Sequence, residues 1–282
     1  MKRLIVTADD VGLHEGMTLG AIRAHRDGIV TACSVAGAGT ALAHAAEHLK
    51  DCPGLDVGVH LMLVEAGRFA RDYRGFVARY MLGRVSMQEV ERELRLQIER
   101  VLGYGLRPCH LNGHQHLHVL PRVFPIVVRL ALEYGVPYIR IPDDRMPANV
   151  PLARRGAVGA LGALARRAAR TAHGAGLFTN DTAIGIANAG HLTAARLITL
   201  AGQVNGVTEL VTHPGLDGPG LARAYGWRYE WDRETEALCD PEVRACLARE
   251  GIERVGVRAV AMPAGGGCLR SSCRCDSPAD RG

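Results

Sequence analysis

Short apolar runs alternate with longer amphipathic stretches along most of the chain. The runs are rich in β-branched residues and have the length of buried strands, while the stretches between them carry apolar positions at helical spacing. We predict strands at residues 3–7, 30–35, 56–63, 108–111, 138–141, 208–212 and 255–260. We predict helices between the first five of these strands at residues 15–27, 40–50, 86–102 and 122–133.

Residues 86–102 give the clearest helical signal. Ser86 and Glu89 have the spacing of a capping box, in which each side chain satisfies a backbone N–H at the start of a helix. Val90, Leu94 and Ile98 then fall on one helical face. We therefore expect this helix to lie against a sheet with its apolar face inward.

Repeated strand–helix units indicate a parallel sheet, because crossover helices return the chain to the same direction. About seven such units fit a closed or partly closed barrel better than an open doubly wound sheet. A dinucleotide-binding GxGxxG motif does not follow the first strand. We therefore predict an α/β fold, a single-domain distorted (β/α) TIM-like barrel with about seven parallel strands over residues 1–263, and a disordered tail over residues 264–282.

Composition narrows the class of protein. The chain has 282 residues, of which 48% are hydrophobic and 22% charged, as in an ordinary globular protein. A net charge of +5 spread over this length does not provide the massed basic surface that binds nucleic acid. Uninterrupted apolar runs of the ~20 residues that a membrane span needs are absent. The first residues resemble a signal peptide, but Asp9 and Asp10 end the apolar run too early, so we expect a cytoplasmic protein.

The eight cysteines are scattered and include no CxxC pair. We expect them to be reduced thiols, most of them small core residues. Cys268, Cys273 and Cys275 lie in the predicted tail, where a frayed terminus is favoured over a soft-metal site.

Polar side chains follow several of the predicted strands. In a barrel of parallel strands, chemistry gathers at the carboxyl ends of the strands. These ends carry Asp9 and Asp10, His60, the segment Asn112–His118, Arg140 and His213. Their shared location predicts one functional site at this face of the barrel.

Asp9 and Asp10 can both face one site only where the strand ends and the backbone turns, and Gly12 would permit such a turn. A bound cation would keep both carboxylates ionised, although the pair could instead cap the following helix. His60 is either a metal ligand or a hydrogen-bonded core histidine.

Four of the 12 histidines lie within residues 110–118. An extended chain would place His114, His116 and His118 on one face, whereas a helix would pair His114 with His118. Mixed aspartate and histidine ligation suits Zn²⁺ or another first-row divalent ion better than Mg²⁺. A solvated histidine-rich loop is the alternative.

His213 and Arg140 have two interpretations each. His213 ends a strand in the sequence THPG and is either a general acid or base or a hydrogen-bonded loop residue. Arg140 is either the ion-pair partner of Asp9 or Asp10 or a residue that contacts the substrate.

These motifs together resemble a known family. The segments TADDVGLH at 7–14, VGVHL at 57–61, HLNGHQHLH at 110–118, YIR at 138–140 and ELVTHPG at 209–215 are similar, in this order, to those of the YdjC-like carbohydrate deacetylases. That family includes the chitooligosaccharide deacetylases and the hopanoid-associated HpnK group. The resemblance runs from the first strand to about residue 260.

The resemblance implies a distorted (β/α) barrel and one divalent metal ion, Zn²⁺ or Mg²⁺. It implies that Asp10, His60 and His114 are the metal ligands, Asp9 the general base and His213 the proton donor. Arg140, Asn112, His116 and His118 would orient these groups or contact the substrate. The chain departs from the family pattern at three places, with Val11 in place of Phe, Asn112–Gly113 in place of Asp-Ser, and Gln115 in place of a third consecutive His. At Asn112 an amide replaces a carboxylate that could orient a ligand histidine, and this change affects the identity and affinity of the metal.

The implied reaction is hydrolysis of the N-acetyl group of an amino sugar, in an oligosaccharide or a lipid-linked glycoside, to acetate and a free amine. Hydrolysis of another ester or a phosphoester, and a barrel that binds carbohydrate without cleaving it, are the alternatives. A homo-oligomer is compatible with the sequence, and nucleic acid is not an expected partner.

Two further segments bear on the substrate. Residues 151–173 form an arginine-rich amphipathic pattern that could lie on an anionic membrane, although an ordinary barrel helix or a lid is favoured. Tyr225, Trp227, Tyr229 and Trp231 alternate along one short segment. They are either a stacking platform for a sugar ring or part of the core.

Overall fold

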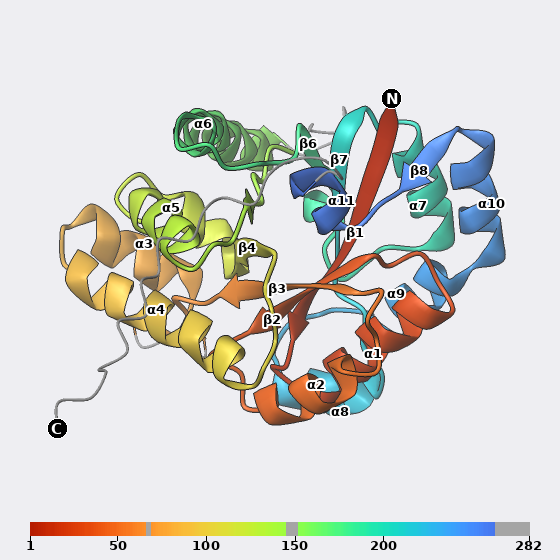
Figure 1. The fold of residues 1–282 in the computed structure, drawn as a ribbon, viewed down its shortest axis with the longest axis horizontal. Coiled ribbons are helices and arrows are strands. Elements are labelled where there is room, and N and C mark those ends of the chain that lie inside the picture. Colours follow the sequence, from red (N-terminus) through yellow and green to blue (C-terminus); the bar gives the residue numbers. More distant parts are fainter. Residues whose placement is uncertain (66–68, 145–151, 263–282) are drawn as a thin grey trace, which may run out of the picture.

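Parallel strands form one curled sheet in the computed structural model, which describes residues 1–65, 69–144 and 152–262 (Figure 1). For residues 152–158 and 160 the backbone alone is described. The strands in this part of the chain are β1 (Lys2–Val11), β2 (Ala32–Ala36), β3 (Asp56–Leu61), β4 (His110–Gly113), β5 (Tyr138–Ile139), β6 (Thr182–Ile184), β7 (Gly206–Thr212) and β8 (Ile252–Arg254).

The long strand β1 lies at the centre of the sheet, whose order is β5-β4-β3-β2-β1-β7-β6. β7 pairs along one edge of β1, and the other edge is shared, because β8 pairs with its first residues and β2 with its last. The two ends of the sheet approach each other through bridges between Tyr138 and Phe178 and between Asp144 and Ala183. The predicted distorted barrel with about seven parallel strands is therefore confirmed.

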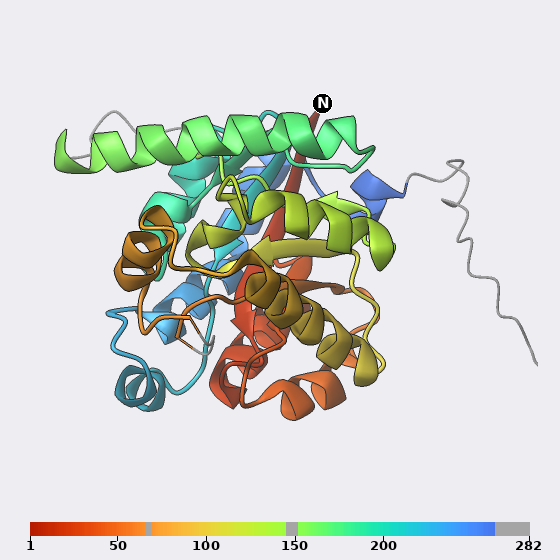
Figure 2. The same ribbon diagram turned by 90° about the vertical axis from the view of Figure 1, so that its left-hand side faces the viewer.

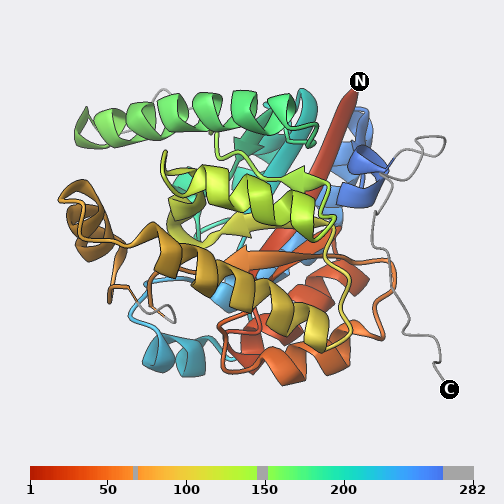
Figure 3. The same cartoon turned by 60° about the vertical axis from the view of Figure 1, so that its left-hand side comes forward.

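Helices surround the sheet on its outer side (Figure 1). Their bounds are α1 (Glu15–Arg26), α2 (Leu42–Leu49), α3 (Tyr73–Met81), α4 (Met87–Gly103), α5 (Phe124–Glu133), α6 (Leu152–Gly174), α7 (Ala194–Ala201), α8 (Gly218–Ala224), α9 (Trp231–Cys239), α10 (Pro241–Arg249) and α11 (Val257–Ala261), with short 3₁₀ helices η1 (His114–Val119) and η2 (Ile186–Asn188). Figures 2 and 3 show α6 lying along the flank of the barrel beside α5, which in turn contacts α4.

The helix predicted at residues 86–102 is α4. The Ser86 side chain accepts the Glu89 N–H and so caps its first turn. Val90, Leu94 and Ile98 are completely buried against the sheet, and each contributes about 1.5–3 kcal/mol through burial. The start of this helix and its inward face, both predicted from the sequence pattern, are therefore confirmed.

The strand predicted at residues 255–260 is wrong. The strand there is β8, which ends at Arg254, and residues 257–261 form helix α11. Gly251 adopts a positive φ of 65° directly after α10, which lets the chain reverse and pair with β1 at once. Val257, Val260 and Ala261 are buried at the i, i+3 and i+4 spacing of a helix, which the run of valines concealed.

The arginine-rich pattern at residues 151–173 corresponds to α6. Where its side chains are described, the apolar face packs on the core through Leu161, Leu164 and Ala168, while Arg166 and Arg167 are exposed. This packing is that of an ordinary barrel helix, and contact with a membrane stays a prediction. Across the described residues, we find no helix with both the length and the apolar character of a membrane span.

Cys33, Cys52, Cys109, Cys239 and Cys246 are free thiols, as predicted. Cys268, Cys273 and Cys275, like the tail predicted at residues 264–282, lie outside the described residues.

Candidate metal centre and active site

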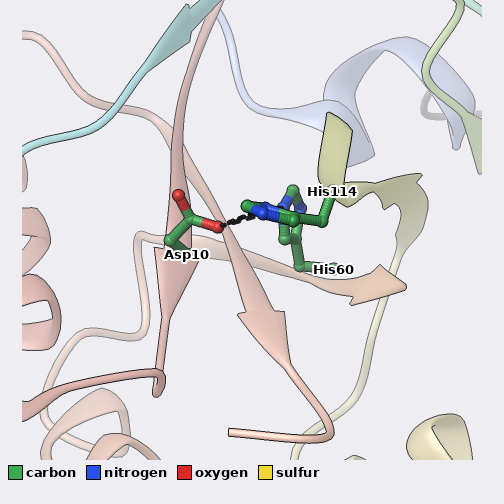
Figure 4. A group of neighbouring side chains, drawn as sticks. All are labelled: Asp10, His60 and His114. Carbon is green, nitrogen blue, oxygen red and sulfur yellow. Dashed lines mark hydrogen bonds and ion pairs between the residues drawn. The ribbon is translucent and has the colours of Figure 1, made fainter. Parts of the chain in front are cut away.

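The carboxyl ends of the strands bring five of the predicted site residues together. Asp9 and Asp10 come from β1, His60 from β3, His114 from the junction of β4 and η1, and His213 from the end of β7. The first four are at most 6% exposed. Figure 4 shows that Asp10, His60 and His114 point toward one another.

The turn that lets Asp9 and Asp10 share one site lies at Asp10 itself. The pairing of β1 with β2 slips between Ala8 and Val11, and Asp10 adopts the left-handed conformation with φ 64°. Aspartate tolerates this conformation better than most residues. Gly12 follows with φ 84°, so the predicted turn is present and begins two residues earlier than the glycine.

Three potential ligand atoms converge in a compact triangle. Asp10 Oδ1 lies 3.1 Å from His114 Nδ1 and 3.2 Å from His60 Nε2. The two histidine nitrogens are 3.4 Å apart. Ligands bonded at about 2.0–2.2 Å to one tetrahedral ion would be about 3.3–3.6 Å apart. The separations in the triangle are within about 0.2 Å of this range, so the three atoms could hold a divalent metal with at least one further coordination position open.

Asn112 sets which nitrogen of His60 faces this triangle. Its amide nitrogen donates to Asp9 Oδ1 at 3.0 Å and to Ser34 Oγ at 2.7 Å, so its oxygen is left as an acceptor. That oxygen lies 2.8 Å from His60 Nδ1. His60 therefore carries its proton on Nδ1 and directs the lone pair of Nε2 toward Asp10, as a metal ligand requires.

Replacing Asn112 by alanine is expected to lower the affinity for a divalent metal about 10–100-fold, because His60 loses the acceptor that fixes its tautomer. Competition with a chromogenic chelator measures this affinity. Ser34→Ala is the matched control, since it removes one of the two acceptors of the Asn112 amide nitrogen and leaves His60 bonded. Equal affinities in Asn112→Ala and Ser34→Ala would contradict the role given to Asn112.

His114 lies between two carboxylates. Its Nε2 is 3.4 Å from Glu65 Oε2, on the side of the ring opposite Asp10. Burial alone would lower the pKa of His114, but Asp10 and Glu65 outweigh it and raise the pKa to about 10. The surroundings of His114 thus favour a positive charge at this place. Glu65 was not identified from the sequence, although it follows β3 at the carboxyl face.

Asp9 stays outside the triangle because a buried arginine holds it. Arg140 contacts both Asp9 oxygens, with Nη2 2.9 Å from Oδ1. Burial would raise the pKa of Asp9, but Arg140 and then His60 hold it well below its usual range. Of the two interpretations of Arg140, the ion pair is therefore present, and the complete burial of Arg140 prevents contact with substrate.

Arg140 also contacts a carboxylate that the sequence reasoning missed. Glu209 Oε1 lies 2.8 Å from Nε and 2.7 Å from Nη2 of Arg140. Tyr138 and Thr7 also donate their hydroxyl groups to Glu209, which is completely buried. The sequence signal that could have identified Glu209 was its place as the single acidic residue in the mostly apolar run at 207–211.

His213 lies at the rim of the site with its side chain 11% exposed. Its Nε2 is 3.9 Å from Asp10 Oδ2, and its backbone N–H donates to Glu234. Burial lowers the pKa of His213, while Asp10 and Asp9 act in the opposite direction. The imidazole therefore faces the carboxylates, where it could exchange a proton with a bound molecule.

The remaining histidines of the 110–118 segment do not join the triangle. Gln115 and His116 adopt left-handed conformations inside η1, so the chain there is neither extended nor α-helical and neither predicted geometry forms. His118 bonds to the carbonyl of Arg140 at 2.9 Å, and burial lowers the pKa of His118 to about 4. His110 is buried beside Ser34. His118 thus holds the backbone at Arg140, directly after β5.

The aromatic segment, residues 225–231, lies across the site. The rings of Trp227 and His114 have centroids 5.3 Å apart, and those of Tyr229 and His213 are 5.2 Å apart. Trp231 is only 1% exposed and belongs to the core, whereas Tyr225, Trp227 and Tyr229 are half-buried. The core role is therefore confirmed for Trp231, and the stacking role stays a prediction for the other three, which also pack partly against the core.

The chain is similar to known proteins along most of its length. Residues 3–249 match the family model described as YdjC-like protein. The chain is 29% identical over 269 residues to a carbohydrate deacetylase of Geobacillus stearothermophilus, which covers 90% of this chain and 96% of that protein. It is 37% identical over 148 residues to a carbohydrate deacetylase of Brevibacillus brevis, where the match covers 50% of this chain and 59% of that protein, less than two thirds of its length.

A solved structure from Enterococcus faecalis, described as a candidate cellobiose-phosphate cleavage protein, has the same fold. Its TM-score is 0.71 at 23% identity, over 93% of this chain and 99% of the other.

Proposed function

Because this chain belongs to the YdjC-like protein family, we propose that it is a metal-dependent hydrolase that removes the N-acetyl group from an N-acetylated amino sugar. The carbohydrate deacetylase of Geobacillus stearothermophilus, similar along nearly the whole chain, supports this reaction. The observation that carries the proposal is the triangle of Asp10, His60 and His114 beside a separately held, ionised Asp9.

The three residues of the triangle would hold one divalent ion. Their two imidazoles and one carboxylate suit Zn²⁺ or another first-row ion better than Mg²⁺, which prefers oxygen ligands. Such an ion, when bound, supplies Lewis acidity to the acetamide carbonyl and acidifies water.

Asp9 is the general base in this proposal. It takes a proton from the water that attacks the acetamide carbon, and a carboxylate with a low pKa is present in its ionised form throughout the neutral range. Arg140 fixes the carboxylate by a two-point contact and keeps it from joining the metal ligands.

His213 is the proton donor in this proposal. The carbon–nitrogen bond breaks as the amine nitrogen takes a proton from the imidazole, which leaves acetate and a free amino sugar. Burial lowers the pKa of His213, so the imidazole has to take up a proton before it can donate one, and its protonated form is then a stronger acid.

The substrate is an oligosaccharide or a lipid-linked glycoside in this proposal, and the protein acts in the cytoplasm. Acetate release from N-acetylglucosamine oligomers, measured beside a panel of O-acetyl esters and phosphoesters, tests the bond that is cleaved. Turnover of the phosphoesters without acetate release would replace the proposal with phosphoester hydrolysis. Sugar binding without turnover of any compound would leave a carbohydrate-binding barrel.

His114→Ala and Asp10→Ala are each expected to lose the bound metal and acetate release together, because only two ligand atoms of the triangle remain. Metal analysis of the purified proteins and an acetate assay measure both. His173→Ala, which changes an exposed histidine on α6, is the matched control. Full metal content and activity in Asp10→Ala or His114→Ala would refute the assignment of the site.

A further inference from the structure

Glu234 is a buried carboxylate beside the site that the proposed reaction does not use. It lies in the first turn of α9 and is completely buried. Among the described residues, no cationic side chain is close enough to form an ion pair with it. Burial raises the pKa of Glu234 to about 7, although the backbone N–H groups of His213, Leu192 and Gly190 oppose this rise. Burying a carboxylate without a cationic partner is costly, so packing alone does not account for a glutamate at this place.

The two oxygens of Glu234 accept backbone N–H groups from two separate loops. Oε1 accepts the N–H of His213 at 2.6 Å, directly after β7. Oε2 accepts the N–H of Leu192 at 3.3 Å, between η2 and α7. The next residue, Thr235, bonds through its hydroxyl group to the N–H and the carbonyl of Gly215, each at 2.9 Å. Two consecutive residues of α9 therefore hold the chain that follows β7.

The imidazole of His213 depends on this backbone contact for its orientation. Its buried Nδ1 has no hydrogen-bond partner in the described part of the chain, and its Nε2 is 3.9 Å from Asp10 Oδ2, too far for a hydrogen bond. Pro214 restricts the backbone of His213 to extended conformations. The place of the ring is therefore set by its own backbone and by the rings that pack against it.

Tyr229 packs against the His213 ring, and Glu234 holds the loop beneath it. The centroids of the two rings are 5.2 Å apart. Gly190 has a positive φ of 73°, and a Cβ at this position would collide with the Tyr229 ring. Tyr229 thus lies directly on the loop that Glu234 binds through Leu192. One carboxylate therefore acts on the His213 ring by two routes, its backbone and its aromatic neighbour.

We propose that Glu234 is a positioning residue, which directs the His213 imidazole toward the amine nitrogen of the substrate by fixing the backbone of His213 and the loop under Tyr229. A proton donor works only within hydrogen-bond reach of the atom that it protonates. A misplacement of about 1 Å can cost about 100-fold in rate. This inference rests on the proposed function for the role of His213 as proton donor.

Glu234→Gln tests the proposal with little change in volume. The glutamine oxygen is the single acceptor of the new side chain, and its NH₂ group then faces a backbone donor. Protein containing Zn²⁺ and isotope-labelled histidine is compared by NMR, and His213→Ala identifies the His213 resonances by their loss. We expect Glu234→Gln to shift the His213 resonances and to leave those of His60 and His114 in place. Unchanged His213 resonances, or equal shifts in all three histidines, would overturn the proposal.

Acetate-release kinetics provide the second test. Glu234→Gln should lower kcat about 10-fold and change KM less than about 2-fold, because the substrate still binds while the proton donor is misaligned. In a His213→Ala background the same substitution should lower kcat no further, since no imidazole is left to position. Equal losses in the two backgrounds would overturn the proposal, because Glu234 would then act on the fold and not through His213.

Glu93→Gln is the matched control for the loss of a buried carboxylate. Glu93 lies on α4 and accepts a hydrogen bond from Gln97 at 2.8 Å, which the oxygen of a glutamine can also accept. We expect this variant to have the kcat of wild type. A 10-fold loss in Glu93→Gln as well, on the order expected for Glu234→Gln, would count against a specific role for Glu234.

The two proposals fail in different ways. A wild-type protein that releases no acetate, but whose His213 resonances respond to Glu234→Gln, would refute the deacetylase and leave Glu234 as the residue that positions His213. Acetate release with a kcat that Glu234→Gln does not change would leave the deacetylase standing and refute the role of Glu234.

Discussion

Replacing Asp9 by asparagine is expected to lower kcat for acetate release by about 10²–10⁴-fold while the metal stays bound. Asparagine has nearly the same shape, and its oxygen can accept from Asn112 and from Arg140 Nη2 as Oδ1 does. Its amide nitrogen cannot accept from Arg140 Nη1, so one of the two contacts with Arg140 is lost. Asparagine cannot take a proton from water, however, because the amide is a very weak base. The triangle of Asp10, His60 and His114 does not include Asp9 and should therefore retain its ion.

The kcat of acetate release and the metal content per chain are the two measurements that this prediction needs. Asp51→Asn, at an exposed aspartate beyond α2, is the matched control and should be fully active. Loss of metal together with activity in Asp9→Asn would show that Asp9 is a ligand. Unchanged kcat would remove Asp9 from the mechanism.

Arg140→Met is expected to lower the free energy of unfolding by about 3–5 kcal/mol. Arg140 is completely buried between Asp9 and Glu209, and both carboxylates would stay buried without a cation. Methionine fills much of the same volume, so the loss reports mainly the two uncompensated charges. Acetate release should fall as well, because Asp9 would lose the contact that orients it.

Denaturant unfolding followed by circular dichroism measures this loss of stability. Arg233→Met removes the arginine of an exposed ion pair with Glu230 and should cost at most about 1 kcal/mol. Arg140→Lys should fall between the two, because a single ammonium group cannot reproduce the contacts that the guanidinium makes with both carboxylates. Similar losses in Arg140→Met and Arg233→Met would show that the buried network contributes little.

Much of the fold could be predicted because the apolar spacing along short segments indicates strands and helices. The strands at β1, β2, β3 and β7 were predicted near their observed places because each is a buried apolar run flanked by a helix. β6 was missed because it has three residues, too few for a periodic signal. The site was placed at the correct face because the carboxyl ends of parallel strands meet there.

The sequence by itself determined which residue types stand at the strand ends, and hence that aspartates and histidines would gather at one face. Only the tertiary structure decided which of these side chains face the metal triangle and which turn away from it. His114 faces Asp10 while His116 and His118 turn away, because two left-handed residues redirect the chain within one turn.

The same holds for the two neighbouring aspartates. Asp10 joins the two histidines and Asp9 does not, because Asp9 is bound by Arg140. Arg140 lies 131 residues further along the chain. Glu209 and Glu65 were assigned no role from the sequence, since each depends on partners brought close by the closing sheet. Local patterns report hydrophobicity and backbone preference, whereas the pairing of buried charges depends on contacts between distant residues that form only when the barrel closes.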